Sequence, residues 1–519
     1  MAFTMNSVNL ETMLDHQRDS RSAIRESLAV RESQPTLPRW RAMMIIMAVS
    51  LMTLMSTVLS GILAVALPKV AHDIGLEDGL LLWPASVYSL SCACTLLFFG
   101  SLADVVGAKN NYTAGSLLSV GWILACGFAR TGVQLIVFRA LHGIAISMCL
   151  PSSVSILTTN FEPGQRRNMA FASLGAAQPT GFLIGLFLGG ILTDLVSWRL
   201  CFYLVAGVNA AVLLLSVFCI PDNPVERGTA VERFRSKVDW FGVLLISSAL
   251  GLLSYVLAAV TVDMSTISQP ANIAMLVLSG LLFPAFGVWA HSQEKRGRPA
   301  LIPNTLWSNA VFRSISLLSF FAWATVTVNQ YFIALFFEKV QLLSAFATSL
   351  RFLPLVVSGV LANVATGALV RHVRADILIA GAVLLSAATP LLMALADPAL
   401  PYWGIAFPAA LLSPIAADVV LTIANLAITA IFPPEKHGLA GSVTNMLAQL
   451  GTSFGLNLTT ILASAVTLHS GHLSKSSPQA LDTGYRASFW ASFAATVVML
   501  MLIFPGLRKI GKVGAIKTE

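Results

Sequence analysis

Long apolar runs constrain this chain more than any other feature. The 519 residues are 56% hydrophobic and only 11% charged, with a mean hydropathy of +0.78. A soluble domain has about 25% charged residues, and a helix needs about 20 apolar residues to cross a bilayer. About fourteen such runs occur between residues 43 and 507. We therefore expect an all-α protein embedded in a lipid bilayer by 14 transmembrane helices.

The expected spans form two groups of six with two extra helices between them. We expect a disordered tail at 1–42, a six-helix bundle at 43–220, linkers and two inserted helices at 221–308, a second six-helix bundle at 309–507, and a tail at 508–519. The spans themselves are predicted at 43–67, 80–103, 112–130, 133–158, 169–193, 200–220, 240–262, 273–291, 311–337, 344–369, 377–396, 404–431, 439–466 and 485–507.

Charge asymmetry orients these spans. The two tails and the even-numbered loops carry 23 Lys and Arg residues, leaving aside Arg313 at a boundary, while the odd-numbered loops carry six. Positive residues concentrate in cytoplasmic loops, so both termini are expected to be cytoplasmic. The net charge of +8 follows from this bias, and no basic patch with interleaved aromatic residues favours a nucleic-acid partner.

The chain offers little for enzymatic or metal chemistry. Its six cysteines lie in or beside apolar runs of the first half, which favours small buried hydrophobic residues over disulfides or metal ligands. No phosphate-binding Gly-x-x-x-x-Gly-Lys-Ser/Thr loop occurs. We expect no enzyme activity, cofactor or metal, and a monomer that handles a small-molecule substrate.

A glycine-rich turn, GSLADVVGAKNNY, occupies residues 100–112 between two apolar runs. Gly100 and Gly107 allow two helix ends to approach closely. Asp104 and Lys109 stand where the membrane meets water. We predict a gating hinge in which Asp104 forms contacts that break when two halves of the protein move. The alternative is a simple tight turn with interfacial charges.

Two ionisable residues stand inside the fourth expected span, LIVFRALHGIA at 135–145. An arginine at this depth costs about 2.5–3.5 kcal/mol on insertion scales and normally faces a cavity or a partner. His142 follows Arg139 by three residues and shares its face. We interpret the pair as functional. The alternatives are an arginine that snorkels outward and a histidine that only packs.

The fifth expected span carries a face of small residues in LGAAQPTGFLIGLFLGG, 174–190. Small residues four apart let membrane helices pack closely, and a proline kinks the helix. The alternative is an ordinary packing face. The residues concerned are Gly175, Pro179, Gly181, Gly185, Gly189 and Gly190.

Asp418 lies within the twelfth expected span, where a bare carboxylate is costly and is a functional candidate by default. The alternative is a structural cap to another helix. Candidate substrate-binding residues are polar or aromatic side chains of the spans, although each polar one alone also fits a helix–helix hydrogen bond. They are Gln178, Trp323, Asn329, Gln330, Tyr331, Asn425, Asn445 and Gln449.

These motifs together resemble those of the major facilitator superfamily. The turn at 100–112 is similar to that family's loop between spans two and three. LIVFRALHGIA is similar to its fourth-span Arg-x-x-Gln-Gly motif, with His142 in place of glutamine, and the glycine-rich run at 174–190 to the fifth-span motif of its exporting, antiporter branches. Ala-Leu-Pro at 66–68 and the two inserted helices resemble the fourteen-span drug:proton antiporters, most of all fungal members.

The resemblance implies the major facilitator fold and proton-coupled export of drugs, toxins or secondary metabolites across the plasma membrane. In that family the fourth-span arginine is associated with proton coupling, which implies such a role for Arg139. The first-span Asp and Asn of those antiporters align with Leu59 and Ala64 here. We therefore predict that Asp418 carries the proton and that Arg139 and His142 also take part in proton coupling.

Two other functions stay open at this point. Loss of the first-span acid is compatible with uptake or facilitated diffusion of a nutrient or siderophore. A non-transporting membrane sensor or scaffold belongs to a different class. It would be expected to carry a large soluble domain or a long structured tail, which the short tails do not offer.

Overall fold

The structure is a computed structural model that describes residues 38–77, 80–161, 165–221, 239–298, 300–370, 372–398, 400–432, 434–470 and 477–507. Most of the predicted N-terminal tail, the linker residues 222–238 and the tail at 508–519 lie outside these ranges. The described residues form helices and contain no β-strand. Residues up to Met44 form one unit and Ile45–Glu519 another, and the packing described below is that of the second unit.

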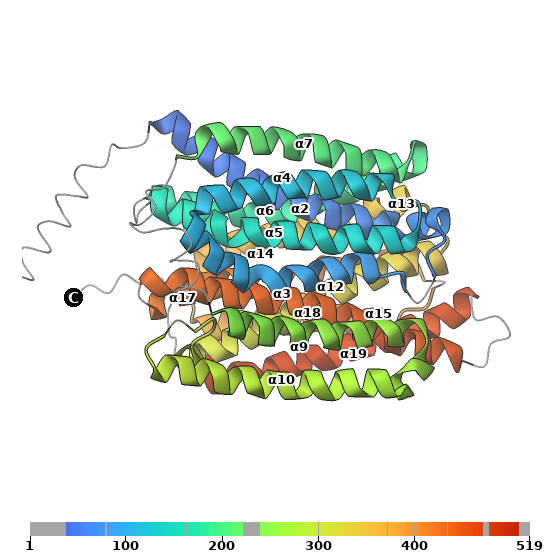
Figure 1. The fold of residues 1–519 in the computed structure, drawn as a ribbon. Helices are drawn as coiled ribbons and strands as arrows, with labels where there is room; N and C mark the ends of the chain where they lie inside the picture. The colour runs from blue at the N-terminus through green and yellow to red at the C-terminus, as the bar shows by residue number, and fades with distance from the viewer. Residues whose placement is uncertain are drawn as a thin grey trace, which may run out of the picture. The chain divides into compact units, whose positions relative to one another are not determined.

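The first six long helices follow the six expected spans, with ends that differ by up to seven residues (Figure 1). They are α2 (Arg39–Ile74), α3 (Trp83–Val106), α4 (Ala108–Phe128), α5 (Gly132–Asn160), α6 (Gln165–Leu195) and α7 (Trp198–Cys219). We call these the N-terminal group. The inserted pair is α9 (Trp240–Val262) and α10 (Pro270–Lys295), joined by the 3-10 turn η2 (Met264–Ser268).

The later helices differ from simple single spans in three places. A short α11 (Asn304–Ser308) leads into α12 (Ala310–Leu335), which ends in a π-helical turn, η3 (Phe336–Val340). Two of the expected spans are each broken into two helices. The remaining members of this C-terminal group are α13 (Ala345–Arg351), α14 (Leu353–Leu369), α15 (Ala375–Ala394), α16 (Ala406–Leu412), α17 (Ile415–Ile431), α18 (Pro434–Leu468) and α19 (Pro478–Gly506).

Thirteen helical segments of the described chain are long and apolar enough to cross a bilayer. The 21-residue α4 is not among them because its first turn, with Lys109, Asn110 and Asn111, is polar. It nevertheless occupies the position of the third expected span. The prediction of an all-helical membrane protein is confirmed, with thirteen spans rather than fourteen meeting this criterion.

The two helix groups share an apolar core at one end. We call the end where α2, α6 and η3 finish the distal end. There, buried residues of both groups form a single cluster, from Leu63 and Trp198 to Phe332, Leu355 and Phe489. At the opposite, proximal end, two further clusters belong mainly to the C-terminal group and the inserted pair, and α3 is the helix of the N-terminal group that contributes to one of them. The groups are thus joined most extensively at the distal end.

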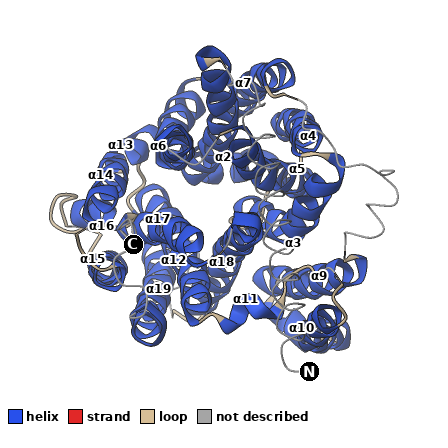
Figure 2. Cartoon of the chain, turned by 90° about the vertical axis from the view of Figure 1, so that its left-hand side faces the viewer, coloured by secondary structure: helices blue, strands red, loops and turns tan. Residues whose placement is uncertain are grey.

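The inserted pair packs beside α3 and α18 (Figure 2). Two hydrogen bonds fix α9 against α3: Trp83 Nε1 donates to Thr261 Oγ1 (2.9 Å), and Ser247 Oγ donates to the Cys94 carbonyl (3.0 Å). The pair is therefore attached to one side of the fold and takes no part in lining the space between the two groups.

Asp239 joins α9, α10 and the segment before α11 at one end of the inserted pair, and its replacement should destabilise this end. The buried carboxylate caps α9 through Gly242 N (2.9 Å) and also accepts from Trp289 Nε1 (2.9 Å) and Leu301 N (3.2 Å). Since each hydrogen bond to a charged group contributes about 1.5–3 kcal/mol, Asp239→Ala should lower the melting temperature of the purified protein by about 2 °C or more. Asp263→Ala removes a fully exposed cap on η2 and should leave that temperature unchanged. Equal effects of the two substitutions would contradict this account.

Candidate functional site

A cavity of ≈ 190 Å³ lies between the N-terminal and C-terminal helix groups. Its walls come from α2, α3, α5 and α6 on one side and from α12, α14, α17 and α18 on the other. Arg139 and Asp418 are the charged side chains that line it within the described residues, and they belong to opposite groups. Six of the predicted binding residues also line it: Gln178, Trp323, Gln330, Tyr331, Asn445 and Gln449.

Arg139 is held rigidly in one wall of the cavity although it is only 1% exposed. Its Nε donates to the Pro84 carbonyl (3.0 Å), and the guanidinium lies over the Tyr88 ring at 4.4 Å. Tyr88 in turn shares a hydrogen bond of 2.5 Å with Ser56. A cation over an aromatic face is attracted by the ring quadrupole. The side chain therefore turns inward to defined partners and does not snorkel.

His142 positions this arginine. Arg139 Nη1 lies 3.2 Å from His142 Nδ1, and His142 Nε2 lies 3.1 Å from Ser119 Oγ. Guanidinium N–H groups can only donate, so Nδ1 accepts and the ring hydrogen is on Nε2, directed to Ser119. The imidazole also stacks on Tyr88 with centroids 5.2 Å apart. His142 does not line the cavity itself.

Asp418 stands in the first turn of α17, just after the break at Pro414 that separates α16 from α17. The Asn363 side chain on α14 lies beside the carboxylate. Its Nδ2 donates to the Gly359 carbonyl (3.1 Å), and its Oδ1 accepts from Thr422 Oγ1 (2.9 Å). Gly359, also on α14, leaves room for the carboxylate, since a Cβ there would lie 2.8 Å from Asp418 Oδ2. Among the described residues no basic nitrogen lies within 4.0 Å of Asp418. The carboxylate thus faces the cavity with a neutral partner.

Two predicted binding residues lie elsewhere. Asn329 is buried and its Oδ1 accepts from Ser492 Oγ on α19 at 2.9 Å, which makes it a helix–helix contact. Asn425 is exposed and does not line the cavity. Both residues belong to α17 and share a face, but Asn425 lies about 10 Å further along the helix, beyond the lining of the cavity.

Sequence reasoning missed a row of hydroxyl groups on α2. Thr53, Ser56, Thr57 and Ser60 all line the cavity. Their spacing of three and four residues places them on one face of a helix, so the pattern was visible in the sequence. Together with Tyr88 they give the N-terminal wall a polar lining beside Arg139.

The glycines of α6 bring its backbone against α2. A Cβ at Gly181 would meet the Leu54 carbonyl, one at Gly185 would lie 3.0 Å from Gly61 Cα, and one at Gly189 would lie 2.8 Å from Ile62 Cα. Gly190 instead faces the other helix group, where a Cβ would lie 3.0 Å from Phe346 Cα on α13. Open space surrounds Gly175, and Pro179 lines the cavity.

A second glycine contact, not predicted, lies in the C-terminal group. A Cβ at Gly451 on α18 would lie 3.1 Å from Phe320 Cα, and one at Gly455 would lie 3.0 Å from Ala324 Cα, both on α12. The Gly-x-x-x-Gly spacing at 451–455 was the available signal. Each helix group thus contains a glycine-mediated contact of this kind between two long helices.

The turn predicted at 100–112 is shorter than the motif suggests. Helix α3 continues through Gly100 to Val106, and α4 begins at Ala108. Gly107 alone separates them, with a φ of 100° that strongly favours glycine. The backbone of Asp104 is helical, but its side chain lies outside the described residues. Lys109 is half-buried in the first turn of α4.

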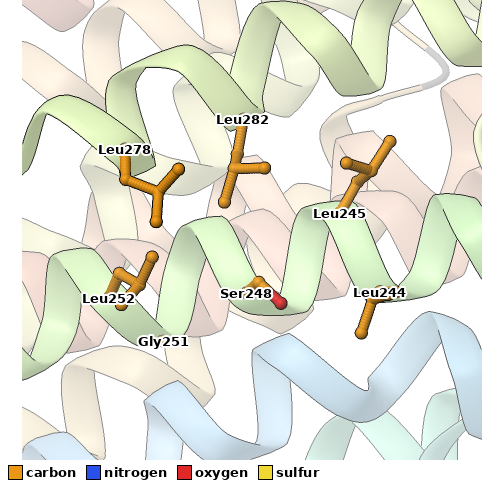
Figure 3. A pocket seen from close by; sticks show the side chains of 7 residues that line it. All are labelled: Leu244, Leu245, Ser248, Gly251, Leu252, Leu278 and Leu282. Carbon is orange, nitrogen blue, oxygen red and sulfur yellow. The ribbon is translucent and has the colours of Figure 1, made fainter. Parts of the chain in front are cut away.

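A second hollow is an apolar groove of ≈ 560 Å³ on the inserted pair (Figure 3). Its lining combines leucines of α9 and α10 with Ser248 and Gly251, and it carries no charged side chain. Leu244 and Leu278 in it are largely exposed, as expected for a helix surface that faces lipid. Elsewhere in the described chain no group of three His, Cys, Asp or Glu residues could hold a metal ion.

Comparisons with known proteins agree with this architecture. The sequence profile of the Major Facilitator Superfamily matches residues 49–456. "MFS-type transporter 1" of Pyricularia oryzae is 40% identical over 93% of this chain and 86% of its own length. "Efflux pump terJ" of Aspergillus terreus is 25% identical over 84% of this chain and 83% of its own.

Solved structures show the same fold. A bacterial homologue of the human lysosomal transporter Spinster, in an inward-facing and unoccupied conformation, superposes with a TM-score of 0.60 and 15% identity over 91% of this chain and 98% of its own. The profile match spans nearly all of the N-terminal group, the inserted pair and the C-terminal group as far as α18. The chain therefore belongs to the Major Facilitator Superfamily and is a multi-pass membrane transporter.

Proposed function

We propose that this protein exports small organic compounds by alternating access, coupled to inward movement of protons through Asp418. The observation that carries the proposal is the cavity between the two helix groups, whose described lining includes one carboxylate and one guanidinium. In this proposal the transporter lies in the plasma membrane, with both termini in the cytoplasm, and works as a monomer.

The division of the packing supports a rocking movement. The two groups share a continuous apolar core at the distal end, whereas the clusters described at the proximal end join the C-terminal group to the N-terminal group through α3 alone. Packed interfaces of this kind switch between discrete arrangements. The cavity volume of ≈ 190 Å³ is below the roughly 300–1,000 Å³ of drug-sized sites. A larger substrate would require the groups to separate at one end.

Asp418 suits the role of proton carrier. It faces the cavity, has a neutral partner in Asn363 and can reach a substrate or water there. The first-span positions that carry Asp and Asn in drug:proton antiporters hold Leu59 and Ala64 here, and both are buried in the described core. Asp418 is therefore the acidic group of the described cavity wall on which a proton can be loaded and released.

Export is favoured by the glycine face of α6 and by the fungal relative named as an efflux pump. The absence of a first-span acid favours the second candidate, uptake or facilitated diffusion without a proton. A pH gradient distinguishes the two, because only a coupled transporter accumulates its substrate against a concentration gradient.

Replacement of Asp418 by asparagine should abolish this coupling. Cells that lack the protein would first be screened for compounds to which they become sensitive, and uptake of the strongest hit would be measured in inside-out vesicles with an acidic lumen. The native protein is expected to accumulate the compound only with the gradient. Asp418→Asn, at matched protein level, is expected to equilibrate it without accumulation, because the amide cannot carry the proton.

Asp376→Asn is the matched control. Asp376 forms an ion pair with Arg374 (2.9 Å) and does not line the cavity. This variant should accumulate the compound like the native protein. Unchanged accumulation by Asp418→Asn would refute its role as proton carrier. Gradient-independent equilibration by the native protein would instead support facilitated diffusion.

A further inference from the structure

Arg139, which is buried, and Asp418, which is half-buried, face the same cavity without pairing with each other or with any other described ionic group. Neither Arg139 nor Asp418 has an oppositely charged atom of the described residues within 4.0 Å. Removing a charge from water costs several kcal/mol unless a counter-charge and hydrogen bonds compensate. A fold that keeps both charges in the walls of one cavity therefore leaves each available to a charged ligand.

The hydrogen-bond inventory of Arg139 leaves donors for such a ligand. A guanidinium has five N–H groups. The Nε–H is used by the Pro84 carbonyl and one Nη1–H by His142 Nδ1. Five minus two leaves three N–H groups without an assigned partner among the described residues. Two N–H groups in a fixed fork match the two oxygens of a carboxylate.

Asp418 offers the complementary half of the site. Its one assigned partner is the Asn363 side chain, and an ionised carboxylate has about four lone-pair sites. An ammonium group of a ligand can therefore approach it from the cavity. The aromatic side chains of Trp323, Phe182 and Tyr331 line the same cavity and offer apolar surface to a ligand.

From this arrangement we propose that the substrates are amphoteric compounds, in which a carboxylate binds Arg139 and an ammonium binds Asp418 across a short apolar body. The inference rests on the proposed function, because it takes this cavity as the transport site. It also explains how substrate and proton exchange, since the ammonium group binds at Asp418, the residue that carries the proton when no substrate is bound. Because the two charges belong to different helix groups, such a ligand bridges the groups.

Four probes of one size test the proposal on the full-length protein in phosphatidylcholine nanodiscs, which carry no anionic lipid. They are 4-(aminomethyl)benzoate, which bears both charges, 4-(aminomethyl)benzamide, 4-methylbenzoate and 4-methylbenzamide. Binding would be measured by isothermal titration calorimetry. We expect the doubly charged probe to bind about tenfold or more tightly than either singly charged probe, as one charged hydrogen-bonded contact predicts.

Two substitutions test which residue binds the carboxylate of the probe and which binds its amine. Arg139→Gln should abolish the preference for benzoate over benzamide and keep the preference for the amine, and Asp418→Asn should do the reverse. Arg139→Lys, which keeps the positive charge, should retain a weakened carboxylate preference and serves if Arg139→Gln does not fold. Equal binding of all four probes by the native protein, or loss of both preferences in each variant, would overturn the inference. Because vesicle transport uses the compound from the sensitivity screen, the proposed function can fail or survive separately from these binding results.

Discussion

Replacing Gly185 with leucine is expected to abolish transport and to destabilise the N-terminal helix group. A side chain at this position meets the Val58 carbonyl and lies 3.0 Å from Gly61 Cα, so the obstacle is backbone on α2 and cannot rotate away. Overpacking costs about 1–3 kcal/mol where side chains can adjust. Here the whole helix must shift, and we expect about 3 kcal/mol or more, a loss of about 100-fold in the packed state.

The measurements are vesicle uptake of the compound from the sensitivity screen and the melting temperature of the purified protein. Gly175→Leu is the control on the same helix, because nothing lies within 4 Å of a Cβ at Gly175. It should leave both quantities close to those of the native protein. If Gly175→Leu were as damaging as Gly185→Leu, the glycine-rich motif would matter for a reason other than contact with α2.

The order and nature of the spans could be predicted because they depend on local properties. A run of apolar residues must be helical in a bilayer wherever it occurs, since its backbone polar groups have no other partners. The depth of Arg139 and Asp418 in their spans likewise predicted that both face a cavity, because lipid does not accommodate a charge. Both residues do line the cavity.

Contacts between distant segments could not be predicted in the same way. The sequence suggests that Asn329 is a binding residue. Its side chain instead accepts a hydrogen bond from Ser492, 163 positions away, in a contact between two helices. Asn111 reads as part of a polar turn, yet its Nδ2 contacts the Met148 carbonyl and Ser152 Oγ, both at 3.0 Å, and ties α4 to α5. Nothing in the local sequence of either residue indicates which partner the fold brings to it.

The break between α16 and α17 is an intermediate case. Pro414 within an apolar run signals a kink or the start of a helix, but the hydropathy pattern alone predicts one span. The break places Asp418 in a first helical turn and not at the centre of an uninterrupted helix. Its exposure to the cavity therefore depends on the break between α16 and α17, which the prediction of one continuous span does not include.

The glycine contacts of α6 with α2 and of α18 with α12 lie at corresponding places in the two helix groups. This correspondence predicts that a substitution in α18 also has a large effect on transport. Helix α6 is the fifth span of its group and packs on the first, α2. Counting α13–α14 and α16–α17 as one span each, α18 is the fifth span of its group and packs on the first, α12. Parallel repeats of this kind are a feature of such transporters. A substitution in α18 should therefore have the same consequence as one in α6.

Gly451→Leu is accordingly expected to abolish transport, although the glycine lies in a segment with none of the recognised motifs. A Cβ there meets the Phe320 carbonyl oxygen and lies 2.8 Å from its carbon, which again is backbone that cannot yield. The expected cost is about 3 kcal/mol or more, as for Gly185. Gly441→Leu on the same helix has nothing within 4 Å of its Cβ and should preserve vesicle uptake and melting temperature. Normal uptake by Gly451→Leu would show that α12 and α18 can separate without loss of function, and the two helix groups would then not depend on equivalent contacts.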